Sequence, residues 1–259
     1  MALDREQKTE IAKHLREKIS EKLESYARET TPMPFHTRLF GEERMATYSF
    51  IQSCNTMLGT SIFEQVAEII AKPHFAEVST QYDLRGKISN EEVAVIEEIL
   101  RSLTSAKTSA DKLNEVKRIL SVKPSKSKTE KSRVDLRVVD KNGLEYFFDV
   151  TSPKPNMKEF KELKRKLLTW TALSKKPVVT ALAIPYNPYH PQPYERWTLR
   201  GLYDLKNEVF VEQDFWDFLG GKGAFFDLLQ IFEEVGRELN PKINTKISEI
   251  AKATRQKSL

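Results

Sequence analysis

The chain has 259 residues, with 42 basic and 37 acidic side chains and a net charge of +5. Hydrophobic residues make up 39% of it and charged residues 31%, which is typical of a folded globular protein. Its longest apolar stretch, residues 178–184, is far shorter than the ~20 residues that cross a bilayer, so no membrane span is expected. The single cysteine, Cys54, excludes an intramolecular disulfide and a cysteine-rich zinc module, and together with a charged amino terminus it favours the cytoplasm.

The first part of the chain, residues 1–120, is expected to be mostly helical. Apolar side chains recur there every three or four residues, which is the spacing of an amphipathic helix. One helix begins with the capping-box pair Ser89 and Glu92. Residues 33–41, which follow a proline and contain another, are expected to form an ordered connection. The expected helices are residues 5–29, 43–59, 61–72, 89–103 and 109–120.

The second part, residues 121–259, is expected to hold the sheet of a single α/β domain that spans the whole chain. Residues 134–140 and 144–151 have the composition of strands, and the Asn142-Gly143 step between them is a strong signal for a hairpin turn. A helix and two more strands are expected next, followed by helices from residue 213 with a break at glycines 220 and 221. The helix is residues 157–171, and the strands are residues 178–184 and 209–211.

Positive charge concentrates in residues 117–137, which contain eight basic side chains against two acidic ones. Within this stretch, residues 123–132 have no apolar side chain beyond one proline, so they are expected to form an exposed loop. A positive surface loop suits a phosphate backbone. The alternative is a solvated linker with no ligand.

Two aspartates are expected to face each other across the hairpin. In an antiparallel hairpin, residues that face each other have numbers with the same sum. The numbers of Asp135 and Asp149 sum to 284 and those of the turn residues Asn142 and Gly143 to 285, so the two aspartates are expected to lie roughly opposite each other. Opposed carboxylates repel unless a cation lies between them, and Mg²⁺ prefers oxygen ligands. The alternative is a pair of rim aspartates that bind Arg137 or neighbouring lysines.

The helix expected after Asp149 is rich in cations. Carboxylates beside concentrated positive charge are what phosphodiester hydrolysis needs, because the metal activates water and the cations hold phosphate oxygens. The basic residues of this helix are Lys158, Lys161, Lys164, Arg165 and Lys166.

With the hairpin and this helix, several other motifs make the chain similar to one known family. They are residues 35–41 (Phe-His-Thr-Arg-Leu-Phe-Gly), 49–64, 152–156 (Ser-Pro-Lys-Pro-Asn), 185–189 and 214–221. Together they cover most of residues 33–240. On these motifs the chain resembles type II restriction endonucleases of the PD-(D/E)XK superfamily, and among them the TdeIII-like group.

The resemblance implies a PD-(D/E)XK nuclease-like fold, a mixed β-sheet flanked by helices. It implies Mg²⁺-dependent cleavage of double-stranded DNA at a short, roughly palindromic sequence, leaving 5′-phosphate ends. A homodimer is expected, because a palindrome presents two equivalent half-sites to a two-fold protein. The resemblance also implies a prokaryotic cytoplasm and a cognate DNA methyltransferase in the host, which is not expected to form a complex with the nuclease.

The resemblance also assigns roles to individual residues. Asp135 takes the place of the first aspartate of the motif, which binds metal near the scissile phosphate. Asp149 takes the place of the second carboxylate, with the Val150 carbonyl beside it as a further metal ligand. Glu64 resembles a helix carboxylate that some members direct at the metal, and its alternative role is a salt bridge within its helix.

The chain departs from the motif at Thr151, where a lysine is expected. A threonine hydroxyl cannot supply the positive charge that activates water and stabilises the transition state. Lys154 is favoured to take over this role because prolines fix its backbone on both sides. Two alternatives are open: a lysine of the following helix, such as Lys158 or Lys161, takes the role, or the chain is a catalytically weakened form.

Further polar residues are candidates for DNA contacts, either to base edges or to phosphates. Each has a plain alternative as part of a connecting or solvent-exposed loop. The candidates for base reading are His36, Arg38, Asn187, His190, Gln192 and Arg196, and the candidates for phosphate contact are Lys126, Lys128, Lys131, Arg133, Asn156, Lys158 and Lys161.

Two rival functions are open at this point. A PD-(D/E)XK nuclease of repair or recombination would share the hairpin but would cut according to DNA structure. A DNA-binding relative with a vestigial site would follow from the threonine at position 151, and it would bind DNA without cleaving it.

Overall fold

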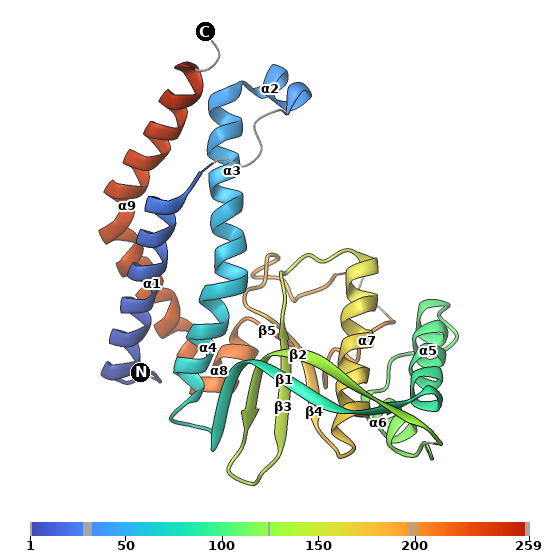
Figure 1. The fold of residues 1–259 in the computed structure, drawn as a ribbon. Coiled ribbons are helices and arrows are strands. Elements are labelled where there is room, and N and C mark those ends of the chain that lie inside the picture. The colour runs from blue at the N-terminus through green and yellow to red at the C-terminus, as the bar shows by residue number, and fades with distance from the viewer. Residues whose placement is uncertain (1, 28–32, 124, 197–198, 200, 257–259) are drawn as a thin grey trace. The chain divides into compact units, whose positions relative to one another are not determined.

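The computed structural model describes residues 2–27, 33–123, 125–196, 199 and 201–256 (Figure 1). It divides the chain into two compact units. The helical unit comprises residues 1–66 and 226–259, and the sheet unit comprises residues 67–225. In the described part of the chain, no helix is long and apolar enough to cross a membrane.

The helical unit joins the two ends of the chain, whose helices are blue and red in Figure 1. Asp227 ties them together, because its carboxylate accepts hydrogen bonds from the Ala2 and Leu3 N–H groups and pairs with Lys8 at 2.8 Å. The helices are α1 (Arg5–Ser25), α2 (Pro34–Phe40), α3 (Glu42–Met57), the short π-helix η1 (Leu58–Ile62), α4 (Phe63–Ala71) and α9 (Ala224–Gln256), the last two of which extend into the sheet unit.

Two expectations for the helical unit need correction. Residues 33–41 were expected to be a connection, but they contain α2, because Pro34 at the first helical position has a backbone φ that suits a helix start. The first helix ends at Ser25 and not at residue 29; residues 28 and 29 lie outside the described part. The helices expected at 43–59 and 61–72 are confirmed and are joined through η1.

The sheet unit is built on five strands in the order β1-β2-β3-β4-β5. The pairs β1–β2 and β2–β3 are antiparallel, whereas β3–β4 and β4–β5 are parallel. The mixed α/β class is therefore confirmed. The strands are β1 (Glu77–Ser89), β2 (Ser127–Val139), β3 (Glu145–Val150), β4 (Val179–Ile184) and β5 (Val209–Val211).

The long antiparallel ribbon of β1 and β2 differs most from the expectations. No strand was expected at residues 77–88, although apolar and polar side chains alternate there. Residues 123–132 were expected to be a loop, but from Ser127 onward they pair with β1, in register from Ser89↔Ser127 to Glu77↔Val139. An exposed strand with polar side chains has the same composition as a loop. These residues form a strand because their backbone groups make hydrogen bonds to β1, which is distant in the sequence.

The helices of the sheet unit are α5 (Asn90–Thr104), α6 (Lys112–Leu120), α7 (Met157–Ser174) and α8 (Gln213–Gly220). Helix α7 packs on β1 through β4 and contributes the buried side chains Leu167 and Trp170 to the core, where Trp170 meets Phe147 edge-on. Strand β1 approaches α7 so closely that a Cβ at Gly86 would lie 2.4 Å from the Leu173 carbonyl oxygen. The rotation of α7 relative to the sheet is thereby restricted.

Candidate active site

The β2–β3 hairpin brings Asp135 and Asp149 together. Leu136 pairs with Phe148, and the tight turn around Gly143, with φ of +85°, sets this register. Asp135 therefore lies opposite Asp149, as the residue numbering predicted. The Val150 N–H donates to Asp135 Oδ2 at 2.9 Å, which links the end of β3 to the carboxylate on β2.

Lys166 of α7 completes this cluster. Its ammonium group forms an ion pair with Asp149 Oδ2 and lies 3.6 Å from Asp135 Oδ1. Burial lowers the pKa of Lys166, but the attraction of Asp149 and Asp135 outweighs burial, so the pKa lies above its usual value. One ammonium group thus contacts two carboxylates.

The cluster is partly shielded from solvent. Asp149 is 4% exposed, whereas the side chains of Asp135 and Lys166 are 16% and 29% exposed. The Lys166 ammonium also lies 5.1 Å from the centre of the Trp170 ring, one helical turn further along α7. The cluster is thus partly accessible to solvent through Asp135 and Lys166.

The sequence did not single out Lys166. It is one of five basic residues in the helix expected after Asp149, and nothing in their spacing separates it from the others. Lys154, which was favoured for the missing lysine, is exposed, and its ammonium lies 5.6 Å from the centre of the Tyr189 ring. The Thr151 N–H donates to the Ala183 carbonyl at 3.0 Å, which extends the pairing of β3 with β4.

The proline-rich segment 185–196 contacts the backbone that follows Asp149. The guanidinium of Arg196 donates to the carbonyls of Pro155 at 3.0 Å and Lys154 at 3.3 Å, and the Tyr194 hydroxyl donates to the Pro153 carbonyl at 2.7 Å. Arg196 was a candidate for base reading, and in this structure its side chain holds the chain in place beside the site.

The other candidates on this segment lie on its turn. The Asn187 side chain donates to the Gln192 carbonyl at 2.7 Å and accepts from the Tyr189 N–H at 3.0 Å. His190 is exposed, and its Nδ1 lies 3.3 Å from Glu212 Oε1. Gln192 is also exposed.

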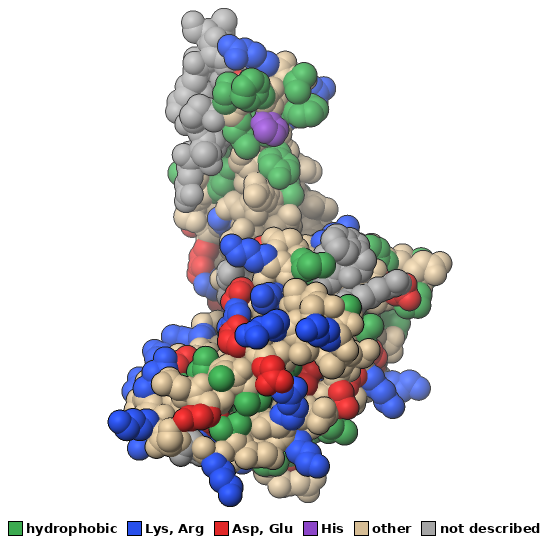
Figure 2. Space-filling view, turned by 90° about the vertical axis from the view of Figure 1, so that its right-hand side faces the viewer, with side chains coloured by type: hydrophobic (Ala, Val, Ile, Leu, Met, Phe, Trp, Pro, Cys, Tyr) green, Lys and Arg blue, Asp and Glu red, His purple; other side chains and the backbone are tan. Residues whose placement is uncertain are grey.

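The basic side chains of β2 are exposed but not isolated from acidic ones. Lys131 and Arg133 pair with Asp83 of β1 at 2.7 and 3.0 Å, and Lys128 pairs with Glu130 at 3.3 Å. Lys126 is exposed just before the strand. Figure 2 shows Lys and Arg side chains interspersed with Asp and Glu on one face.

The remaining candidates near the site lie at the start of α7. Asn156 caps the helix by accepting a hydrogen bond from the Glu159 N–H, and Lys158 in the first turn is exposed. Lys161 is partly buried and lines the same surface pocket as Glu97 of α5.

Three candidate residues belong to the helical unit. Glu64 on α4 is 6% exposed, and His36 and Arg38 are exposed on α2. Asp135, Asp149 and Lys166 belong to the sheet unit, so the two groups of residues lie in different compact units.

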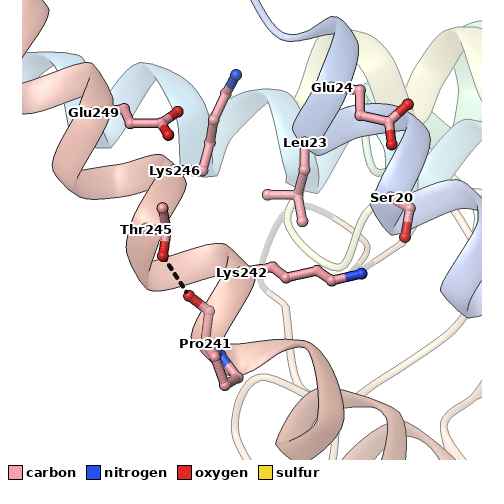
Figure 3. Close-up of a pocket in the computed structure, with 8 residues that line it drawn as sticks. All are labelled: Ser20, Leu23, Glu24, Pro241, Lys242, Thr245, Lys246 and Glu249. Carbon is pink, nitrogen blue, oxygen red and sulfur yellow. Dashed lines mark hydrogen bonds between the residues drawn. The ribbon is translucent and has the colours of Figure 1, made fainter.

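A pocket in the helical unit lies between α1 and α9 (Figure 3). Its lining combines Leu23 with charged and hydroxyl side chains, and the Thr245 hydroxyl donates to the Pro241 carbonyl at 2.9 Å. No histidine or cysteine lines it.

The donor set at the hairpin fits a divalent ion. Among the described residues, no group of three or more His, Cys, Asp or Glu side chains is arranged to hold a metal. Mg²⁺ does not need such a group, because one or two carboxylates with water and substrate phosphates are its usual ligands. Asp135, Asp149 and the Val150 carbonyl match this smaller set.

Comparison with known proteins finds similarity to type II restriction enzymes. The family model of the type II restriction endonuclease HinfI matches residues 3–236. Type II restriction enzyme HgiEI of Herpetosiphon aurantiacus is 29% identical over 233 residues, which cover 87% of this chain and 85% of the relative. HgiBI of the same organism is 29% identical over 222 residues, covering 83% and 81%.

Proposed function

The chain belongs to the HinfI family of type II restriction endonucleases, and on this basis we propose that it cleaves double-stranded DNA at a short, roughly palindromic sequence with Mg²⁺, leaving 5′-phosphate ends. Enzymes of this type generally use divalent metal ions. The observation that carries the proposal is the pair Asp135 and Asp149, opposed across one hairpin and contacted by one ammonium group.

Asp135, Asp149 and the Val150 carbonyl are the residues that would hold Mg²⁺. The ion, when bound, would polarise the phosphate and lower the pKa of the attacking water. In the hydrolysis the water oxygen bonds to phosphorus while the bond to the 3′ oxygen breaks; one water proton goes to solvent and the 3′ oxygen takes up a proton. Asp135 and Asp149 orient the reacting groups for in-line attack. Glu64, which the resemblance implies as a metal ligand, belongs to the other compact unit and stays a prediction.

DNA binding in this proposal uses cations of the sheet unit, all exposed except the partly buried Lys161. Lys126 lies just before β2, Lys128, Lys131 and Arg133 lie in the first part of β2, and Lys158 and Lys161 lie on the first turns of α7. These side chains suit phosphates, which position the duplex without reading its sequence. Residues Asn187, His190 and Gln192 on one segment, and His36 and Arg38 on another, remain the candidates for base reading.

The same proposal includes a homodimer, because a palindromic site has two equivalent strands to cut. It also includes the cytoplasm of a prokaryote as the place of action. A DNA methyltransferase in the same host would modify the recognition sequence without binding the nuclease.

Digestion of unmodified phage DNA tests the proposal. In Mg²⁺ the protein should give discrete fragments, end sequencing should show one recognition sequence, and EDTA should abolish cleavage. Cleavage at branched or damaged DNA without sequence preference would instead identify a repair nuclease. A gel shift without cleavage in Mg²⁺ would identify a DNA-binding relative and would overturn the proposed cleavage.

A further inference from the structure

We propose that Lys166 supplies the catalytic cation that the PD-(D/E)XK motif places two residues after its second carboxylate. This inference rests on the proposed function. The expected position holds Thr151, which has no charge to offer. The role is to hold a positive charge against the oxygens of the scissile phosphate and the attacking water as negative charge develops there.

The position of the ammonium group carries the inference. Lys166 forms an ion pair with Asp149 and lies 3.6 Å from Asp135, so its charge is adjacent to both proposed metal ligands. A cation must come within about 3 Å of a reacting oxygen to act on it directly. A phosphate held through a metal ion at these two carboxylates would lie close to the Lys166 ammonium. A small movement of the lysine side chain would then bring the two groups into contact.

Helix geometry separates Lys166 from the neighbouring lysines. With 1.5 Å rise and 100° rotation per residue, Lys158 lies about 12 Å away along the axis of α7, and Lys161 lies about 140° around it. Lys161 lines the same surface pocket as Glu97 of α5. Lys164 points to the opposite side of α7, where it pairs with Glu115 at 2.6 Å and with Glu208.

Several contacts hold α7 in the rotation that directs Lys166 to the carboxylates. The pairs of Lys164 are fully buried, and the Tyr203 hydroxyl donates to the Phe160 carbonyl at 2.7 Å. The close approach of Gly86 to the Leu173 carbonyl restricts the helix from the side of the sheet. Lys166 is therefore presented by a rigid element, as catalysis requires.

The strand geometry explains how one lysine can replace another. Side chains at positions 149 and 151 point to the same face of an extended chain, since side chains alternate along a strand. A lysine at position 151 and Lys166 would thus approach Asp149 from two different elements. This convergence predicts that a lysine restored at position 151 can take over part of the function of Lys166.

The experiment compares Lys166→Met with the double variant Lys166→Met/Thr151→Lys. Methionine removes the charge but keeps an unbranched apolar side chain against Trp170. Cleavage of plasmid DNA in Mg²⁺ is measured under single-turnover conditions, together with DNA affinity in Ca²⁺ and the thermal unfolding midpoint. Lys176→Met is the matched control, because it removes another ion-paired lysine, bound to Glu145 at 2.6 Å.

We expect Lys166→Met to reduce the cleavage rate at least about 100-fold, with DNA affinity in Ca²⁺ changed less than about threefold, and the double variant to regain at least about tenfold. Lys176→Met should cleave like the unaltered protein. Equal rates for Lys166→Met and the unaltered protein would overturn the role of Lys166 alone. Absence of cleavage by the unaltered protein would overturn the proposed function and the role of Lys166 with it. A rate loss matched by an equal loss of folded protein or of DNA affinity, without rescue at position 151, would show a structural role and overturn the inference.

Discussion

Two clusters of lysine and carboxylate groups lie on opposite sides of α7 and differ in composition and exposure. In the buried cluster, Lys112 and Lys164 balance Glu115 and Glu208, and all four side chains are at most 7% exposed. In the hairpin cluster, Lys166 contacts both Asp135 and Asp149, and the side chains of Lys166 and Asp135 are 29% and 16% exposed.

The difference distinguishes a structural cluster from a site that can bind a ligand. A balanced and fully buried set of charges has no capacity for a further ion, and its main effect is to fix the packing of the elements that carry it. The hairpin cluster is partly exposed, and its two carboxylates are the ligands that we propose for Mg²⁺. The same helix thus serves stability on one face and the proposed chemistry on the other.

The largest expected effect breaks the buried cluster. Lys164→Met leaves Glu115 and Glu208 buried with only Lys112 nearby, and removal of one partner of a buried ion pair typically costs about 3–5 kcal/mol. The free energy of unfolding, measured with urea, should fall by this amount. The double variant Lys164→Met/Glu115→Gln should be more stable than the single variant. A loss below about 1 kcal/mol for Lys164→Met would contradict the structural role.

The next effect removes a proposed metal ligand from the hairpin cluster. Asp149→Asn should lower the cleavage rate at least about 100-fold, which corresponds to about 2.7 kcal/mol. DNA binding should stay the same or tighten, because repulsion toward phosphate is relieved. Stability should change far less than in Lys164→Met. Cleavage at the unaltered rate by Asp149→Asn would refute the assignment of this carboxylate.

A smaller effect is expected where β1 meets α7, since both clusters depend on this contact. Gly86→Ala places a Cβ against the Leu173 carbonyl oxygen, and such overpacking typically costs about 1–3 kcal/mol. Gly236→Ala is the control, because a Cβ there meets no atom within 4 Å and alanine favours a helix. Chemical denaturation should thus show opposite signs for the two variants. Equal stability of Gly86→Ala and the unaltered protein would argue against a tight β1–α7 contact.

The smallest effect concerns a single exposed lysine outside both clusters. If Lys126 contacts a phosphate, Lys126→Ala should reduce the slope of log affinity against log salt by about 0.9. Cleavage at saturating DNA should remain unaltered. Lys107→Ala, which removes an exposed lysine from a different loop, should leave the slope unchanged. An unchanged slope for Lys126→Ala would mean that this lysine is only solvated.

The sequence by itself determined the features that depend on near neighbours. The helices follow from the spacing of apolar residues, and the capping box of Ser89 and Glu92 sets the start of α5. The opposition of Asp135 and Asp149 follows from a short hairpin, in which Val139 pairs with Glu145 around the turn that the Asn142-Gly143 step signals. Recognition of a type II restriction endonuclease rested on the same local motifs.

Only the tertiary structure decided the features that join distant segments. Strand β2 extends to Ser127 because β1 pairs with it across about fifty residues of chain, and no local pattern indicates that partner. Lys166 was selected from five basic residues by the way α7 packs on the sheet. Arg196 holds the backbone at Lys154 and Pro155, about forty residues away. Periodicity specifies which face of a helix is buried, whereas the rotation and partner of that face result from packing of the whole unit.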